Sequence, residues 1–150
     1  MEIKKIELLN KEKVAKTISI GSGCVILRDG KVLLVRGIGG DSFKFPGGHI
    51  EDTETFKQSA ERECEEEIGC KVEAVGEPVF FLFKPDETLN IVLIHYMGKI
   101  AYGEPKPSTE IEEIGWFDVD KLPSNVFDNV KPVLEIINKS VLWLVKSYSF

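Results

Sequence analysis

The chain has 150 residues, of which 43% are hydrophobic and 29% charged, and its formal net charge is −6. This composition is typical of a globular protein, and we expect residues 1–150 to form a single domain. The acidic balance argues against a nucleic-acid polymer as the partner, because proteins that bind such polymers have a basic surface. It permits a small phosphorylated ligand whose charge is offset by a bound divalent cation.

The sequence contains no apolar run of the roughly 18 residues that a membrane-spanning helix needs, and residues 1–10 lack the apolar stretch of a signal peptide. The three cysteines, Cys24, Cys64 and Cys70, show no CxxC spacing. We therefore expect a cytoplasmic protein with no membrane partner and with reduced, mostly buried cysteines. The sequence leaves the oligomeric state open, and a homodimer is compatible with it.

The first predicted element is a β-hairpin over residues 17–35. Apolar side chains alternate along two runs of this segment, and Asp29-Gly30 between them is a strong turn signal. After the hairpin we expect a flexible loop at residues 37–42, a short apolar stretch at 43–46, and a loop with the glycine pair Gly47-Gly48.

A helix is predicted over residues 55–67. Thr55 and Gln58 fit a capping box at its start, and Gly69 stands where a left-handed C-terminal cap belongs. The predicted buried stripe of this helix consists of Phe56, Ala60 and Cys64.

The second half of the chain predicts further strands and a second long helix. The strands are expected at residues 72–83 and 91–100, separated by a turn at 84–87, with a short strand at Trp116-Phe117. The helix is expected from residue 127 to about 146, with Pro132 in its first turn and an apolar side formed by Val133, Ile136, Ile137, Val141, Leu144 and Val145. This order of elements predicts an α+β domain in which helices flank a sheet.

The first helix has an unusual distribution of acidic residues. At 3.6 residues per turn, Glu63, Glu66 and Glu67 share an arc of about 100° that overlaps the apolar face. Like charges at this spacing destabilise a helix, and their partial burial costs more unless a cation neutralises them. Because hard divalent cations prefer oxygen ligands, the arc predicts a Mg²⁺ or Mn²⁺ site.

The same stretch resembles the Nudix box, G-x5-E-x7-R-E-U-x-E-E-x-G-U, at every fixed position. The matching residues are Gly48, Glu54, Arg62, Glu63, Glu66, Glu67 and Gly69. The two U positions, usually aliphatic, are Cys64 and Cys70, which is a mild departure because a free cysteine behaves as a small hydrophobe. The preceding hairpin, the Phe45-Pro46 approach and the Trp116 region are also similar to the family, so the resemblance spans about residues 19–122.

The resemblance implies roles for particular residues. By analogy with the family, Glu63, Glu66 and Glu67 would hold the divalent metal, and the carbonyl group of Gly47 would complete its shell. Arg62 would brace these acids against Glu54. A later loop would add one more acid, for which we choose Glu110, with Glu112 and Glu113 as neighbouring alternatives. The general base would be Glu63 or this later acid.

The resemblance also implies a fold and an activity: a mixed sheet between helices, and a metal-dependent pyrophosphohydrolase that cleaves a small nucleotide by water attack on phosphorus. The substrate would be a nucleoside triphosphate or a nucleotide sugar such as ADP-ribose; the position of Pro85 after the box resembles the ADP-ribose branch, although Pro85-Asp86 also fits a simple turn. The alternatives are a Nudix-fold binding module without turnover, and an unrelated metal phosphatase or nuclease.

Residues outside the box are predicted to set specificity, in loops at 37–42, 84–89 and 101–108. His49 and His95 lack ligand-spaced partners, so we expect core or surface roles for them. The aromatic residues on the predicted strands are expected to belong to the core rather than to a base-stacking platform: Phe80, Phe81, Phe83 and Tyr96.

Overall fold

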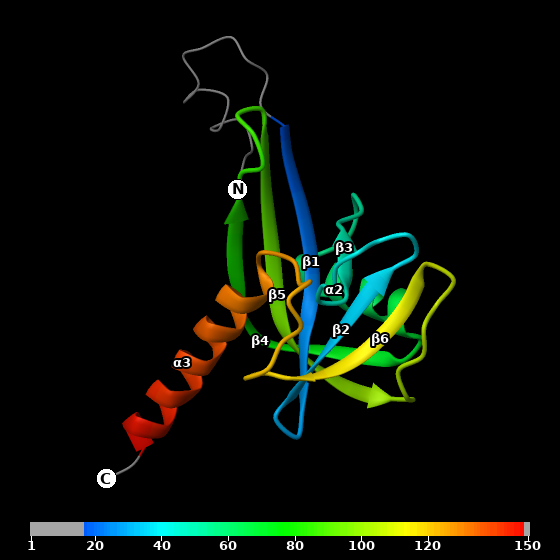
Figure 1. Cartoon of the computed structure of the whole chain (residues 1–150). Helices are drawn as coiled ribbons and strands as arrows, with labels where there is room; N and C mark the ends of the chain where they lie inside the picture. Colours follow the sequence, from blue (N-terminus) through cyan, green and yellow to red (C-terminus); the bar gives the residue numbers. More distant parts are fainter. Residues whose placement is uncertain (1–16, 149–150) are drawn as a thin grey trace.

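The computed structural model describes the backbone of residues 17–148 and the side chains of residues 17–139 (Figure 1). Its elements are β1 (Thr17–Arg28), β2 (Lys31–Gly37), β3 (Gly47–His49), α2 (Phe56–Ile68), β4 (Lys71–Phe83), β5 (Leu89–Tyr102), β6 (Ile111–Asp118) and α3 (Val130–Tyr148). Within this range, neither helix has the length and apolar character required to cross a membrane.

One mixed sheet has the strand order β4-β5-β1-β2-β6. β1 and β5 run parallel from the pair Thr17–Leu89 to the pair Ile26–Gly98, and the other pairs of strands are antiparallel. β1 pairs with β2 only beside the hairpin turn, so the two strands diverge (Figure 1). This divergence leaves an edge of β1 to which β3 adds.

The β3 strand, at positions expected to be a loop, depends on glycines that let two backbones approach closely. Gly21–Gly23 of β1 pairs with Gly47–His49. A Cβ atom on Gly23 would lie 2.3 Å from the carbonyl oxygen of Pro46, and one on Gly47 would lie 2.7 Å from that of Ser22. Side chains at these positions would therefore push β3 away from β1.

The sheet buries a hydrophobic core on each of its faces, as the predicted α+β class requires. On one face Ala60, Cys64 and Ile68 of α2 pack against strand residues that include Ile26 and Leu33. On the other face Val130, Val133 and Ile137 of α3 pack with Val25, Val32, Leu34, Phe43 and Phe45. α2 and α3 thus cover opposite faces (Figure 1), and the predicted sheet between helices is confirmed.

The predicted boundaries of α2 are confirmed. Thr55 and Gln58 form both hydrogen bonds of a capping box, and Gly69 ends the helix at φ 66°. The predicted burial of Phe56 is wrong, because its side chain is 42% exposed. Side chains tilt toward the N-terminus of a helix, so the first residue points past the helix end, and Ser59 and Ile68 complete the buried face instead.

The remaining elements differ from expectation mainly in extent. The hairpin turn is confirmed, with positive φ angles at Asp29 and Gly30. β6 extends well beyond Trp116-Phe117, because its outer residues pair with β2, which a short sequence window does not reveal. In α3, Ile136 is 43% exposed rather than buried, and the side chains of Val141, Leu144 and Val145 lie outside the described residues.

Candidate active site

Arg62 binds several of the acids that the sequence grouped together. Its Nε and Nη2 donate to the two carboxylate oxygens of Glu54, and its Nη1 donates to Glu63 at 3.0 Å and to Glu66 at 3.1 Å. Nη2 also donates to the carbonyl oxygen of His49 at 3.1 Å. The planar guanidinium thus ties α2 to the segment that precedes it, which a lysine ammonium cannot do with the same geometry.

This contact network sets the protonation of the acids. The hydrogen bond from Arg62 lowers the pKa of Glu54, and Glu54 in turn raises the pKa of Arg62. Glu63 responds differently: its burial raises the pKa of the carboxyl group, and the hydrogen bond from Arg62 offsets this only in part. Glu54 therefore remains a charged brace, while Glu63 is the better proton acceptor.

Glu67 forms a second charged contact on the same helix. Its side chain is largely buried, with 6% of the residue exposed, and burial raises the pKa of its carboxyl group. The Nζ of Lys44 lies 3.0 Å from both of its carboxylate oxygens and 2.8 Å from the carbonyl oxygen of Gly47. The N–H of Gly47 donates to the same carboxylate at 2.6 Å. Glu67 is thereby fixed against the glycine pair that precedes the helix.

Gly48 lies directly against the carboxylate of Glu63. A Cβ atom at this position would lie 2.5 Å from a carboxylate oxygen of Glu63. Only a residue without a side chain lets the Glu63 carboxylate approach β3 this closely. Lys44 contacts the carbonyl oxygen of Gly47 and Arg62 contacts that of His49, so both cations bind the short strand that contains Gly48.

The acids expected to hold a metal are instead paired with Arg62 and Lys44. Among residues 17–139, no three His, Cys, Asp or Glu side chains converge closely enough to bind a metal ion. However, both carboxylate oxygens of Glu67 and the carbonyl oxygen of Gly47 converge on one cation, the ammonium of Lys44. Because Mg²⁺ takes few protein oxygens and keeps several waters, this donor set fits a hard divalent cation.

Glu110, predicted to join the site from a later loop, lies exposed just before β6. Its loop contacts the end of α2, since the N–H of Ser108 donates to the carbonyl oxygen of Glu67 at 3.2 Å. The two neighbouring alternatives, Glu112 and Glu113, form ion pairs with Arg36 at 2.8 and 3.0 Å. Their side chains are therefore engaged with β2 on the edge of the sheet.

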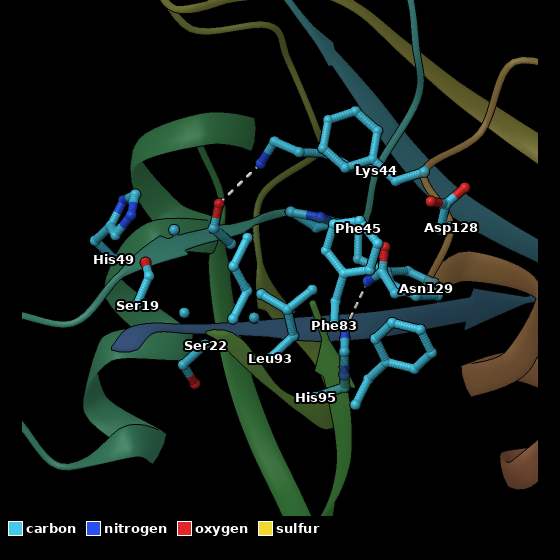
Figure 2. A pocket seen from close by; sticks show the side chains of 18 of the residues that line it. Ser19, Ser22, Lys44, Phe45, His49, Phe83, Leu93, His95, Asp128 and Asn129 are labelled. Carbon is cyan, nitrogen blue, oxygen red and sulfur yellow. Dashed lines mark hydrogen bonds between the residues drawn. The ribbon is translucent and has the colours of Figure 1, made fainter. Parts of the chain in front are cut away.

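The charged cluster consists of the residues just described: Lys44, Gly47, Gly48, Glu54, Arg62, Glu63, Glu66 and Glu67. A cavity of about 630 Å³ begins beside this cluster and extends across the sheet toward α3 (Figure 2). Its walls come from β1, β5, the 42–49 segment, the end of β4 and the 126–129 segment. The lining residues are Ser19, Gly21, Ser22, Gly23, Ser42, Lys44, Phe45, Pro46, Gly47, Gly48, His49, Phe81, Phe83, Ile91, Leu93, His95, Val126, Phe127, Asp128 and Asn129. Lys44, Gly47 and Gly48 belong to both groups, so the cavity adjoins the charged cluster, although the acids of α2 are not part of its lining.

A buried polar pair forms part of the cavity wall. The Nε2 of His95 lies 2.9 Å from the Nδ2 of Asn129 (Figure 2). The Nδ1 of the same ring lies 3.3 Å from the carbonyl oxygen of Val79. Burial lowers the pKa of His95 to about 4, so the ring is neutral at pH 7. Nδ1 then donates to Val79 and Nε2 accepts from Asn129, which fixes the orientation of the Asn129 amide in the cavity.

Several cavity residues were not predicted from the sequence. Phe81 and Phe83 line the cavity rather than only the core, while Phe80 is 59% exposed. Tyr96 and His95 are buried and His49 is exposed, as expected, but both histidines also line the cavity. Of the predicted specificity loops, the first contributes Ser42 to the lining. The aromatic alternation in β4 was a usable signal, whereas nothing local marked Lys44 or residues 126–129.

Comparisons with known proteins agree with this geometry. Over 138 residues, the chain is 28% identical to mRNA-decapping enzyme subunit 2 of Saccharomyces cerevisiae, covering 88% of the chain and 14% of the yeast protein. It is 32% identical over 103 residues to the oxidized purine nucleoside triphosphate hydrolase of Danio rerio, covering 66% of the chain and 65% of that protein. The chain thus spans less than two thirds of the length of these relatives.

The fold has solved counterparts. The crystal structure of a MutT NUDIX hydrolase from Burkholderia pseudomallei superposes with a TM-score of 0.70 at 25% identity, covering 80% of this chain and 98% of that one. The family model of the NUDIX domain matches residues 18–137. This match includes both faces of the sheet, the charged cluster and the cavity, and the chain belongs to the Nudix family.

Proposed function

We propose that the protein is a divalent-metal-dependent pyrophosphohydrolase that cleaves a small nucleotide by water attack on phosphorus. The observation that supports this most strongly is that the groups in contact with the acids, Lys44, Gly47 and Gly48, line one part of a nucleotide-sized cavity. Cavities of this volume are typical of small-molecule sites. A base and sugar in the cavity would place the attached phosphates beside Lys44, Gly47 and Gly48.

Under this proposal each group in the cluster has a separate task. Mg²⁺ or Mn²⁺, when bound, supplies positive charge that neutralises phosphate oxygens. Glu67 and the carbonyl group of Gly47 would hold it, with Glu63, Glu66 and Glu110 as further ligands. Arg62 positions Glu63 through its brace on Glu54.

The proton of the attacking water needs an acceptor in the same cluster. Glu63 is our choice, because Arg62 keeps its carboxylate oriented and Gly48, which lines the cavity, lies directly against it. Glu110, on the exposed loop before β6, is the alternative. Phosphoryl transfer depends mainly on positioning and charge stabilisation, which a rigid helix with a braced arginine can provide.

A nucleoside triphosphate is the favoured substrate. The cavity lining combines aromatic rings, such as Phe83, with the oriented amide of Asn129, and this combination suits a nucleobase. A cavity of this size also suits a free nucleotide. The relative in Danio rerio is named for hydrolysis of oxidized purine nucleoside triphosphates.

A nucleotide sugar such as ADP-ribose is the second candidate. The support from Pro85 is weak, because the adjacent Asp86 accepts hydrogen bonds from the backbone and hydroxyl of Thr88 at 2.7 and 2.6 Å. These bonds account for the segment as a hairpin turn. Moreover, residues 84–88 do not contribute to the lining of the cavity.

The test is a panel of nucleoside triphosphates, oxidized purine triphosphates and nucleotide sugars, incubated with Mg²⁺ or Mn²⁺. We expect release of a nucleoside monophosphate and pyrophosphate from a triphosphate, and loss of turnover in a chelator. Phosphate release from the whole panel would indicate a general phosphatase. Tight nucleotide binding without any product, in both metals, would indicate the silent binding module.

A further inference from the structure

The ammonium group of Lys44 lies among oxygen atoms that the proposed function assigns to a divalent cation. Its Nζ is 3.0 Å from each carboxylate oxygen of Glu67 and 2.8 Å from the carbonyl oxygen of Gly47. All three acceptors are hard oxygen atoms, which are the ligands that Mg²⁺ and Mn²⁺ prefer. The ammonium and a metal ion would therefore compete for the same acceptors.

The charge of Glu67 depends on this contact when no metal is bound. Glu67 is 6% exposed, and a buried carboxylate is costly unless a cation and hydrogen-bond donors compensate it. Within residues 17–139, its ion-pair partner is Lys44. Arg62, the other cation of the cluster, is directed to Glu54, Glu63 and Glu66.

The side chain of Lys44 also has room to leave. It is 25% exposed, lines the cavity and has a flexible four-carbon stem, so its ammonium can move into the cavity without any change in the backbone. Gly47, by contrast, is held by its pairing with Gly23 of β1, and Glu67 by the helix. The acceptors are therefore held by the fold, whereas the Lys44 side chain is free to adopt other rotamers.

We propose that Lys44 is an internal counter-ion that occupies the Glu67–Gly47 position in the metal-free protein and leaves it when a divalent cation binds. This inference rests on the proposed function, because it takes Glu67 and Gly47 as metal ligands. It has two consequences. Lys44 weakens the affinity for the metal, since its own contacts must be broken first, and it stabilises the fold when the metal is scarce.

The direct test measures Mn²⁺ binding by electron paramagnetic resonance, without substrate or turnover. Lys44→Met keeps the length of the stem and removes the charge. Lys57→Met is the matched control, because Lys57 is exposed on α2 and its replacement changes the net charge equally. We expect Lys44→Met to bind Mn²⁺ about tenfold more tightly than the wild type, and Lys57→Met to stay within about twofold.

Thermal unfolding provides the second readout. In chelator, Lys44→Met should melt at a lower temperature than the wild type, and saturating Mn²⁺ should raise its midpoint by more than it raises that of the wild type. If Lys44→Met does not fold in chelator, the double variant Lys44→Met/Glu67→Gln removes both charges and should fold. Failure of the double variant as well would contradict the pairing.

The outcomes separate this inference from the proposed function. Equal Mn²⁺ affinity in the wild type and Lys44→Met, with hydrolysis intact, would overturn the role of Lys44 and leave the function standing. A wild-type protein that binds no Mn²⁺ at millimolar concentration would overturn both.

Discussion

The two helices lie on opposite faces of one sheet but contribute to the site in different ways. α2 provides charged side chains within a few turns: Arg62, which binds Glu54 and Glu63, and Glu67, which we propose as a metal ligand, both come from this one helix. α3 packs through apolar residues such as Val133, and the segment just before it adds Asn129 to the cavity. The charged cluster is thus local in sequence, whereas the cavity is assembled from segments more than 100 residues apart, from Ser19 to Asn129.

The largest effect is expected on the α2 side, for Glu67→Gln. The change removes the charge that a divalent cation would need, so kcat/KM should fall about 100-fold, equivalent to about 2.7 kcal/mol. Initial rates in Mg²⁺ measure this. Glu65→Gln is the control, because Glu65 is exposed on the same helix and its nearest cation, Lys71, is 3.8 Å away. Equal losses in both variants would show that helix charge, rather than a specific ligand, sets the rate.

The next effect concerns the α3 side and the neutral state of His95. Its pKa of about 4 in the fold lies below the unfolded value of 6.5, so the unfolded chain binds the proton more readily. The contribution of His95 to stability is therefore complete above pH 6.5 and is lost as the pH falls toward 4. Between pH 7 and pH 5 the wild type should lose about 2 kcal/mol more than His95→Gln.

Urea unfolding at both pH values checks this linkage. The raised pKa values of Glu63 and Glu67 act in the opposite direction, since these acids take up protons more readily in the folded state. Glu63 and Glu67 are present in the wild type and in His95→Gln, so their contributions cancel when the pH dependence of one protein is subtracted from that of the other. If the free energy of unfolding changes equally with pH in the wild type and in His95→Gln, protonation of His95 does not destabilise the fold. The contact with Asn129 would then not require the neutral ring.

These two regions also mark how far the sequence predicts the structure. Helix α2 was predicted at both ends, because its capping box and Gly69 are local signals with local causes. The acids were predicted to share a face, since helical geometry alone places them there. Arg62 was assigned to brace Glu54 by resemblance, and the bidentate contact agrees with it.

What the sequence did not predict arises from contacts between distant segments. Lys44 precedes Glu67 by 23 residues and meets it only because β3 adds to the edge of β1 that β2 leaves exposed. Asn129 reaches the cavity because α3 packs on the face opposite α2. Periodicity cannot report such contacts. The exposure of Phe56 is a smaller failure of the same kind, since a helical wheel does not show where the covering sheet ends.

A smaller effect on the α2 side is expected for Arg62→Lys. A lysine keeps the charge but cannot donate in one plane to Glu54 and, at the same time, to Glu63. The rate should therefore fall about tenfold, as is common when a residue that orients metal ligands is replaced. Because charge is retained, Mn²⁺ affinity should change less than the rate, and an unchanged rate would reduce Arg62 to a surface ion pair.

The smallest predicted effect tests whether the cavity contributes to binding separately from the charged cluster. Successive side chains of a strand point to opposite faces, so on β4 Phe81 and Phe83 face the cavity while Phe80 points away and is exposed. If a nucleobase packs against Phe83, Phe83→Leu removes a ring contact and should raise KM about threefold, a cost below about 1 kcal/mol. The value of kcat should stay constant, because the acids of α2 are untouched. Phe80→Leu, on the same strand and of the same chemistry, should change neither parameter. Equal KM values for the wild type and Phe83→Leu would place the base outside this cavity, whereas a fall in kcat alone would mean that the cavity and the charged cluster are coupled through the sheet.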